Sequence, residues 1–202
     1  MIINEINYDL NKKSIIIAEG PQGVGKTGLA EYCRENIPYS NLYRLYGTSD
    51  KTITGHDKAK NMYIDLLDYL KKLENADLNL LFDRTFFTEE AFCRLGYKAY
   101  SFSDVYFDLV HKLNDIKLNI FVIFLYLEDI NLYKERLNRD KTKSFTQFTL
   151  DSSVEQQKVY LEMAKELQEY DNINPIVVPT DDFGIAYNKI RMLVPPFNTK
   201  IK

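Results

Sequence analysis

Short apolar runs recur along the chain, separated by longer stretches with helical spacing of apolar residues. The apolar runs predict five strands, at Ser14–Ala18, Asn41–Tyr46, Leu78–Asp83, Ile120–Leu127 and Pro175–Val178. Most of these runs are apolar without clean alternation, which is typical of strands buried on both faces of a parallel sheet. We therefore expect a parallel sheet that is covered on both sides.

The stretches between the runs predict helices, at Lys26–Asn36, Asp57–Glu74, Thr85–Leu95, Ser103–Ile116, Asp129–Arg139, Asp151–Tyr170 and from Asp181 or Asp182 to about Leu193. In the second of these, four apolar residues are spaced to face a core: Met62, Leu66, Leu70 and Leu73. Ser103 and Asp104 are candidate N-caps of the fourth. Strands alternating with helices predict an α/β fold with right-handed crossovers, in which ligands bind at the carboxyl ends of the strands.

The glycines are scarce and clustered: four of the eight, Gly20, Gly23, Gly25 and Gly28, fall in one short window. The first predicted strand runs directly into Gly20-Pro21-Gln22-Gly23-Val24-Gly25-Lys26-Thr27, which matches the phosphate-loop pattern G-x-x-x-x-G-K-[ST] in full. Such a loop turns its backbone N–H groups toward phosphate oxygens, and the following helix adds its dipole. We expect ATP to bind Gly20, Gln22, Gly23, Val24, Gly25, Lys26, Thr27 and Gly28, with Lys26 on the outer phosphates and the Thr27 hydroxyl on Mg²⁺.

A second candidate group, Asp83-Arg84-Thr85, stands at the end of the third predicted strand. At that position the Asp83 carboxylate can help to hold magnesium or accept a proton from an acceptor hydroxyl. Arg84 offers a planar guanidinium that can grip a phosphate through two hydrogen bonds. The simpler interpretation is an ion pair at a strand end, but the order after a phosphate loop favours a functional role.

These motifs, in this order, resemble the thymidylate kinase and deoxynucleoside kinase group of P-loop kinases. The resemblance rests on Glu19-Gly20 through Lys26-Thr27, on Asp83-Arg84 with Ala91 and Phe92 after it, and on Tyr126-Leu127 followed by arginines. It covers roughly residues 14 to 193 and implies a three-layer α/β/α fold, a five-stranded parallel sheet of order 2-3-1-4-5 and a short lid. Residues 1–202 would form one such kinase domain.

The resemblance also implies roles for residues outside the phosphate loop. Arg136 and Arg139 lie where the group carries lid arginines, which neutralise charge on the transferring phosphoryl group. The lid is expected at about residues 136–150. Phe92 falls on an aromatic position beside the acceptor base, and Arg44 is a candidate contact of the acceptor phosphate.

The chain departs from the thymidylate kinase pattern at two places that concern the acceptor. Gln22 replaces an acidic residue of the loop, and Cys93 replaces a base-reading amide. Specificity for thymine is therefore not supported. An Asp rather than a Glu before Arg84 favours a monophosphate acceptor over a nucleoside.

Composition narrows the class of protein further. A formal net charge of -3 gives the whole chain no attraction for a polyanion, so a nucleic-acid partner is not expected. No apolar run is long enough for a membrane span, and the first residues do not resemble a secretory signal. Two cysteines without such a signal indicate reduced thiols in the cytoplasm.

The sequence thus predicts an ATP- and Mg²⁺-dependent kinase of a nucleoside monophosphate, and the resemblance implies that the acceptor is a deoxynucleotide. Three alternatives stay open: a deoxynucleoside kinase with Asp83 as general base, a nucleotide-binding protein without turnover, and a kinase of a nucleic-acid end or modified base. A homodimer is a further option, with the aromatic-rich stretch Phe86–Tyr106 as its surface.

Overall fold

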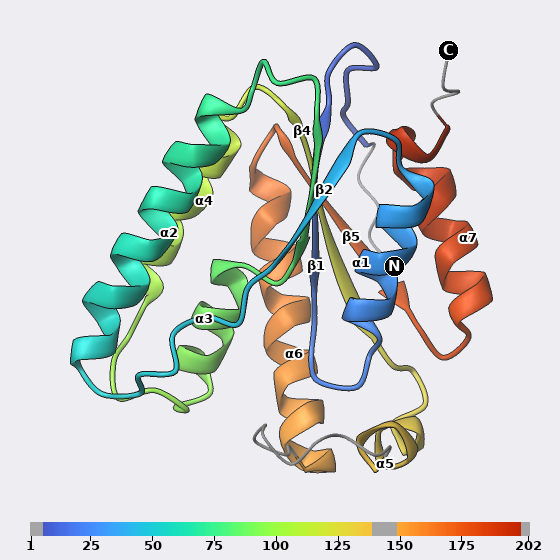
Figure 1. The fold of residues 1–202 in the computed structure, drawn as a ribbon. Coiled ribbons are helices and arrows are strands. Elements are labelled where there is room, and N and C mark those ends of the chain that lie inside the picture. The colour runs from blue at the N-terminus through green and yellow to red at the C-terminus, as the bar shows by residue number, and fades with distance from the viewer. Residues whose placement is uncertain (1–5, 139–148, 199–202) are drawn as a thin grey trace.

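The fold is built on one five-stranded parallel sheet, seen in a computed structural model that describes residues 6–138 and 149–198. The strands are β1 (Ser14–Glu19), β2 (Ser40–Arg44), β3 (Asn79–Asp83), β4 (Asn119–Tyr126) and β5 (Ile173–Pro179). Their order in the sheet is β2-β3-β1-β4-β5, and every neighbouring pair is parallel (Figure 1). The predicted α/β/α architecture and strand order are confirmed.

Helices connect the strands and cover both faces of the sheet. They are α1 (Lys26–Asn36), α2 (Thr54–Lys72), α3 (Phe86–Arg94), α4 (Ser103–Asn114), α5 (Asn131–Leu137), α6 (Leu150–Glu166) and α7 (Phe183–Leu193), with short 3₁₀ turns at Leu167–Glu169 and Pro195–Asn198. The helices α2, α3, α4 and α6 lie on one side of the sheet and α1 and α7 on the other (Figure 1). None of the described helices is long and apolar enough to cross a membrane.

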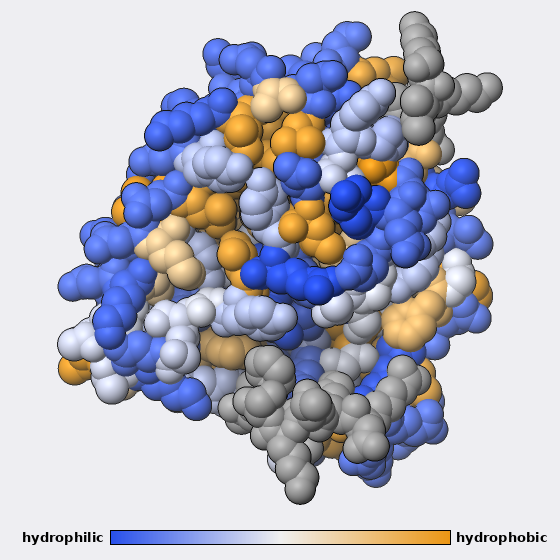
Figure 2. Space-filling model, viewed as in Figure 1, coloured by the Kyte–Doolittle hydropathy of each residue, from blue (hydrophilic) through white to orange (hydrophobic). Residues whose placement is uncertain are grey.

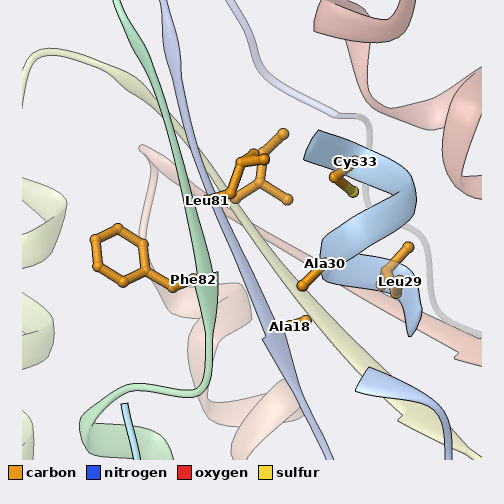
Figure 3. A pocket seen from close by; sticks show the side chains of 7 residues that line it. Ala18, Leu29, Ala30, Cys33, Leu81 and Phe82 are labelled. Carbon is orange, nitrogen blue, oxygen red and sulfur yellow. The ribbon is translucent and has the colours of Figure 1, made fainter. Parts of the chain in front are cut away.

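Each face of the sheet has its own apolar core. Alternate side chains of β1 enter opposite cores, with Ile15 and Ile17 on the side of α2, and Ile16 on the side of α1. Beneath α1, the side chains of Ile16, Leu29, Cys33 and their neighbours leave a gap too narrow for water (Figure 3). In the view of Figure 1, polar side chains cover much of the outer helical surface and apolar ones gather toward the middle (Figure 2).

The buried face of α2 differs from the predicted one. The residues that α2 buries include Ala59, Tyr63, Leu67 and Leu70, whereas Met62 is 39% exposed. Two properties explain the shift. Ala59 permits close packing, and the Tyr63 hydroxyl donates to the Thr85 carbonyl oxygen at 3.4 Å, so the buried hydroxyl keeps a hydrogen-bond partner. The core of α2 therefore forms around a tyrosine that the apolar pattern did not count.

The helix starts contain one correction and one confirmation. Neither Ser103 nor Asp104 caps α4: Ser103 is already its first helical residue, and its Oγ donates instead to Glu90 Oε1 at 2.8 Å. Asp182, by contrast, is the N-cap of α7 and accepts from the Ile185 N–H at 3.0 Å. The preceding residue, Asp181, holds the turn after β4 instead: its carboxylate accepts from the N–H groups of Glu128 and Asp129.

Asparagine side chains fasten the amino ends of the strands. The Asn79 side chain accepts from the Ser14 N–H at 3.0 Å, and that of Asn119 accepts from the Asp9 N–H at 2.8 Å. Asn174 binds Asn7 in the same way at 2.8 Å. These contacts secure the end of the sheet opposite to the phosphate loop.

Candidate active site

The phosphate-loop sequence forms the turn between β1 and α1, at the carboxyl end of the central strand (Figure 1). Gly20 has φ 138°, and a Cβ atom there would lie 2.4 Å from the Leu125 carbonyl oxygen. Gly25, the N-cap of α1, has φ 94°, and a Cβ atom there would lie 2.4 Å from Cε1 of the Phe183 ring. Both positions therefore exclude a side chain by backbone conformation and by space. The loop leads into the N-terminus of α1, whose first N–H groups and dipole suit an anion.

Two further predicted members of the loop have structural contacts. Val24 is fully buried, and its carbonyl oxygen accepts from Thr180 Oγ1 at 2.8 Å, which ties the loop to the end of β5. Lys26 is only 4% exposed, and its ammonium group donates to the carbonyl oxygen of Pro21 within the same loop. Gln22 is half-buried, while Thr27 and Gly28 lie at the surface. The Lys26 ammonium group therefore already contacts the backbone of the loop.

Thr27 and Asp83 come together although they are far apart in the sequence. Asp83 pairs with Ala18 in the β1–β3 register, which brings it to the loop, and Thr27 Oγ1 donates to Asp83 Oδ2 at 2.7 Å. The other carboxylate oxygen, Asp83 Oδ1, is buried and has no hydrogen-bond partner among the described residues. A hydroxyl and a carboxylate with an unused oxygen are ligands that Mg²⁺ favours, so this pair fits the expected metal.

Arg84 adopts a strained backbone conformation next to this pair. Its φ is 76°, in the left-handed region that bulky residues rarely occupy. The turn is held from β1, because the Arg84 N–H donates to the Ala18 carbonyl oxygen at 3.1 Å. The positive charge of Arg84 lowers the pKa of Glu19 and of Tyr160, against the larger opposite effect of burial, so Arg84 lies near both side chains.

Glu19, the last residue of β1, is a buried carboxylate for which the sequence pattern predicts no role. Its Oε1 accepts from the Thr85 N–H at 2.6 Å and from the Thr85 hydroxyl at 3.2 Å. Its Oε2 accepts from Thr88 Oγ1 at 2.8 Å, and that hydroxyl lies 3.1 Å from the Tyr160 hydroxyl. Burial raises the pKa of Glu19 to about 7, against these hydrogen bonds and the charge of Arg84. The only sequence signal was its position directly before Gly20.

Arg136 is buried against the phosphate loop. Its Nη2 donates to the Thr180 carbonyl oxygen at 2.7 Å and to that of Asp181 at 3.2 Å, and its guanidinium lies 4.4 Å from the centre of the Phe183 ring. A Cβ atom on Gly23 would be 3.7 Å from Arg136 Cβ. The side chain thus links α5, the loop after β5 and the phosphate loop. Arg139, and residues 139–148 of the expected lid, lie outside the described residues.

The two candidate acceptor contacts lie on opposite sides of β3. Arg44, at the end of β2, forms an ion pair with Glu31 of α1. Phe92 is half-buried on α3 and makes an edge-on ring contact with Tyr97, with 5.6 Å between the ring centres. These contacts do not test a role in acceptor binding, so the roles of Arg44 and Phe92 stay predictions.

A buried ion pair that the sequence did not indicate borders the site on the α3 side. Lys98 Nζ lies 2.9 Å from Glu89 Oε1, with side chains 3% and 2% exposed. The ammonium group also donates to the carbonyl oxygens of Thr48 at 2.6 Å and Asp50 at 3.3 Å. Tyr100 donates to Glu89 as well. This cluster, which we call the Glu89–Lys98 clamp, fastens the segment between β2 and α2 to α3.

The stretch proposed as a dimer surface is largely internal. Its largest aromatic side chains, Phe86, Phe87, Phe102 and Tyr106, are 0–1% exposed and belong to the core on the α2 side of the sheet. Phe86 and Phe87 stack with 4.5 Å between their ring centres, and Tyr106 makes a tilted contact with Phe86 and an edge-on contact with Phe87. These side chains stabilise the fold and are not available to a partner.

Comparisons with known proteins relate the fold to solved structures. No protein-family model matches the chain, and the search of curated proteins finds no match. A thymidylate kinase from Candida albicans superposes with a TM-score of 0.65 at 12% identity, over 91% of this chain and 91% of that one. This chain has the fold of the thymidylate and deoxynucleoside kinase group of P-loop kinases.

Two other neighbours extend the comparison within that group. A deoxyadenosine kinase from M. mycoides, with the products dCMP and dCDP bound, has a TM-score of 0.55 and 18% identity over 88% of this chain and 96% of that one. The YorR protein from Bacillus subtilis, in complex with phosphorylated GDP, has a TM-score of 0.61 and 16% identity over 93% and 99%. Identities this low show a shared fold and leave the acceptor of this chain open.

Proposed function

We propose that the protein transfers the γ-phosphoryl group of ATP, with Mg²⁺, to a nucleoside monophosphate, and that the acceptor is a deoxynucleotide. The observation that carries this proposal is the Thr27–Asp83 pair at 2.7 Å beside a complete phosphate loop, in a chain with the nucleotide-kinase fold. The free cysteines Cys33 and Cys93 suit a reducing compartment, so we assign the reaction to nucleotide biosynthesis in the cytoplasm.

The phosphate loop would bind the donor. Its N–H groups and the N-terminus of α1 bind the phosphates of ATP, and Lys26 exchanges the Pro21 carbonyl oxygen for phosphate oxygens. Because the ammonium group is already buried within the loop, little side-chain order remains to be gained on binding. Lys26 thereby holds the outer phosphates in the position from which transfer occurs.

Thr27 and Asp83 would hold the magnesium ion. Thr27 supplies its hydroxyl oxygen, and Asp83 supplies the carboxylate oxygen that lacks a partner among the described residues. When bound, the ion neutralises charge on the phosphates during transfer. Asp83 must be ionised for this task, and its position at the end of β3 keeps it fixed beside the loop.

Arg84 would hold the acceptor phosphate, and Arg136 would act from the donor side. Arg84 is half-buried on a turn that is held by hydrogen bonds from β1, which suits a bidentate grip of its guanidinium on a phosphate. Arg136, bound to the Thr180 carbonyl and packed on Phe183, adds positive charge next to Gly23 of the loop. Arg139 remains a proposed partner of Arg136 in this charge neutralisation.

A nucleoside acceptor is the second candidate, and the likeness to a deoxyadenosine kinase favours it specifically. Asp83 would then accept the proton of a sugar hydroxyl, and Arg84 would orient that carboxylate. The two candidates differ in the product that they form from a given acceptor.

Product identification separates the candidates. The protein is incubated with Mg·ATP and each common deoxynucleoside monophosphate or deoxynucleoside, and the products are resolved by chromatography. Diphosphates formed from monophosphates support the proposal and identify the base. Monophosphates formed from nucleosides support the second candidate. K26M is the matched inactive control, and an absence of product from both sets would refute the proposed kinase activity.

A further inference from the structure

The turn that carries Arg84 does not hold its shape by local preference. Arginine in the left-handed region costs free energy, and such conformations persist only where the surrounding structure enforces them. Strain of this kind is concentrated at functional sites. The relevant question is which groups enforce the conformation of Arg84.

Two hydrogen bonds bracket Arg84, and both come from the end of β1. The Arg84 N–H donates to the Ala18 carbonyl oxygen at 3.1 Å. The next N–H, that of Thr85, donates to Glu19 Oε1 at 2.6 Å. The first bond continues the ladder between β1 and β3, whereas the second requires the Glu19 side chain. Two side chains thus reach the backbone of the next residue: Glu19 accepts from the Thr85 N–H, and the Tyr63 hydroxyl donates to the Thr85 carbonyl oxygen at the longer distance of 3.4 Å. Of the two, Glu19 makes the shorter bond and comes from the same strand end that holds the Arg84 N–H.

Both carboxylate oxygens of Glu19 accept hydrogen bonds. Glu19 is 0% exposed, and its second oxygen accepts from Thr88 Oγ1 at 2.8 Å, in a chain that continues to the Tyr160 hydroxyl. The anchor thus spans β1, the turn after β3, α3 and α6. A buried carboxylate is costly, and its hydrogen bonds alone are a poor source of stability. A positional function accounts for its presence.

We propose that Glu19 is a positioning residue that acts through Arg84, holding the strained turn so that the guanidinium and Asp83 keep their places beside the phosphate loop. The kinetic part of this inference rests on the proposed function. The inference requires a side chain at position 19 that is long enough for its oxygen to accept a hydrogen bond from the Thr85 N–H.

Two conservative variants separate reach from charge. E19Q keeps the length of the side chain and a carbonyl oxygen for the Thr85 N–H, and its amide can donate to Thr88 Oγ1. E19D keeps the charge but is one methylene shorter. We expect E19Q to retain kcat/KM for the acceptor within about fivefold and E19D to lose about tenfold to a hundredfold, because small misplacements of a positioned group cost that much.

The variant R84G supplies the second readout, which needs no activity. Glycine adopts positive φ without strain, so a chain with Gly at position 84 no longer needs the anchor. We expect E19D to lower the melting temperature less in the R84G background than in the wild type, and Thr85 N–H hydrogen exchange to accelerate in E19D but not in E19Q. Equal melting-temperature losses in both backgrounds would overturn the inference.

The outcomes also distinguish this inference from the proposed function. A wild-type chain without turnover refutes the function, and the exchange and melting data then decide the role of Glu19 alone. An active wild type with E19D equal to it, or with E19Q impaired as much as or more than E19D, would show that Glu19 acts by charge or not at all, and the positioning role would fail.

Discussion

At the scale of single residues, the active-site candidates divide into those that neighbour one another in the sequence and those that folding brings together. The phosphate loop is contiguous, so its pattern could be predicted residue by residue. The role of Glu19 could not be predicted, because its hydrogen-bond donors Thr85 and Thr88 are distant from it in the sequence. Arg136 was predicted as a mobile lid residue, and its buried contact with the Thr180 carbonyl depends on where β5 ends.

Glu19 leads to a prediction about stability and pH. Burial raises its pKa to about 7 from an ordinary value of 4.5. Between these values the folded chain keeps a proton that the unfolded chain releases, so the contribution of Glu19 to the free energy of unfolding falls as the pH rises. It is fully present below about pH 4.5 and lost once the pH passes about 7. A shift of this size corresponds to about 3 kcal/mol at most.

Urea unfolding of the wild type and E19Q at several pH values between 4.5 and 8 checks this expectation. Other ionisable groups affect both proteins alike, so the difference between the two curves isolates Glu19. We expect E19Q to gain stability relative to the wild type as the pH rises across that window. Curves that stay parallel would contradict a raised pKa at this position.

At the scale of elements, the pattern of apolar runs predicted every strand to within about two residues, and the resemblance to a kinase group supplied their order. Runs such as that of β4 are unambiguous because both faces are buried. The face of α2 was misassigned because Tyr63 buries its ring and still satisfies its hydroxyl. The Glu89–Lys98 clamp was not anticipated, since charged residues are ordinarily expected at the surface.

The clamp leads to a prediction about one connecting segment. K98M leaves Glu89 buried without its partner, which typically costs about 3–5 kcal/mol of unfolding free energy. The double variant E89L/K98M removes both charges and should recover much of this loss. It still lacks the Lys98 bonds to the Thr48 and Asp50 carbonyls, so the segment between β2 and α2 is released. We expect a raised KM for the acceptor and an unchanged KM for ATP.

Chemical unfolding and steady-state kinetics measure the two effects separately. The matched control is R94M, which breaks the bidentate pair between Arg94 on α3 and Glu166 on α6, at 2.6 and 2.9 Å. R94M should lower stability without changing the KM for the acceptor, because that pair does not touch the segment. Equal acceptor KM values in the double variant and the wild type would exclude a role for the clamp in acceptor binding.

At the scale of the whole molecule, the parallel sheet brings distant residues to one edge. Asp83 pairs with Ala18 in one register and with Arg44 in another, so the carboxyl ends of β2, β3 and β1 are level beside the phosphate loop (Figure 1). The amino ends are fastened by asparagines instead. One end of the sheet is thus secured by amide contacts, and the other carries the phosphate loop and the buried Asp83 Oδ1, which a ligand can use.

This arrangement predicts that Mg·ATP stabilises the whole fold through Asp83. A ligand that binds only the folded chain at a hundred times its Kd adds about 2.7 kcal/mol, which raises the melting temperature of a protein of this size by roughly 5–10 °C. Asp83 Oδ1 has no partner among the described residues, so we expect D83N to lose the part of the shift that depends on magnesium while keeping the smaller shift caused by ATP with EDTA.

Thermal melting with ATP, with and without Mg²⁺, measures both parts. D115N, a change of equal charge at an exposed position after α4, is the control and should respond like the wild type. A magnesium-dependent shift in D83N equal to that of the wild type would place the metal elsewhere and leave the buried oxygen of Asp83 without the assigned role.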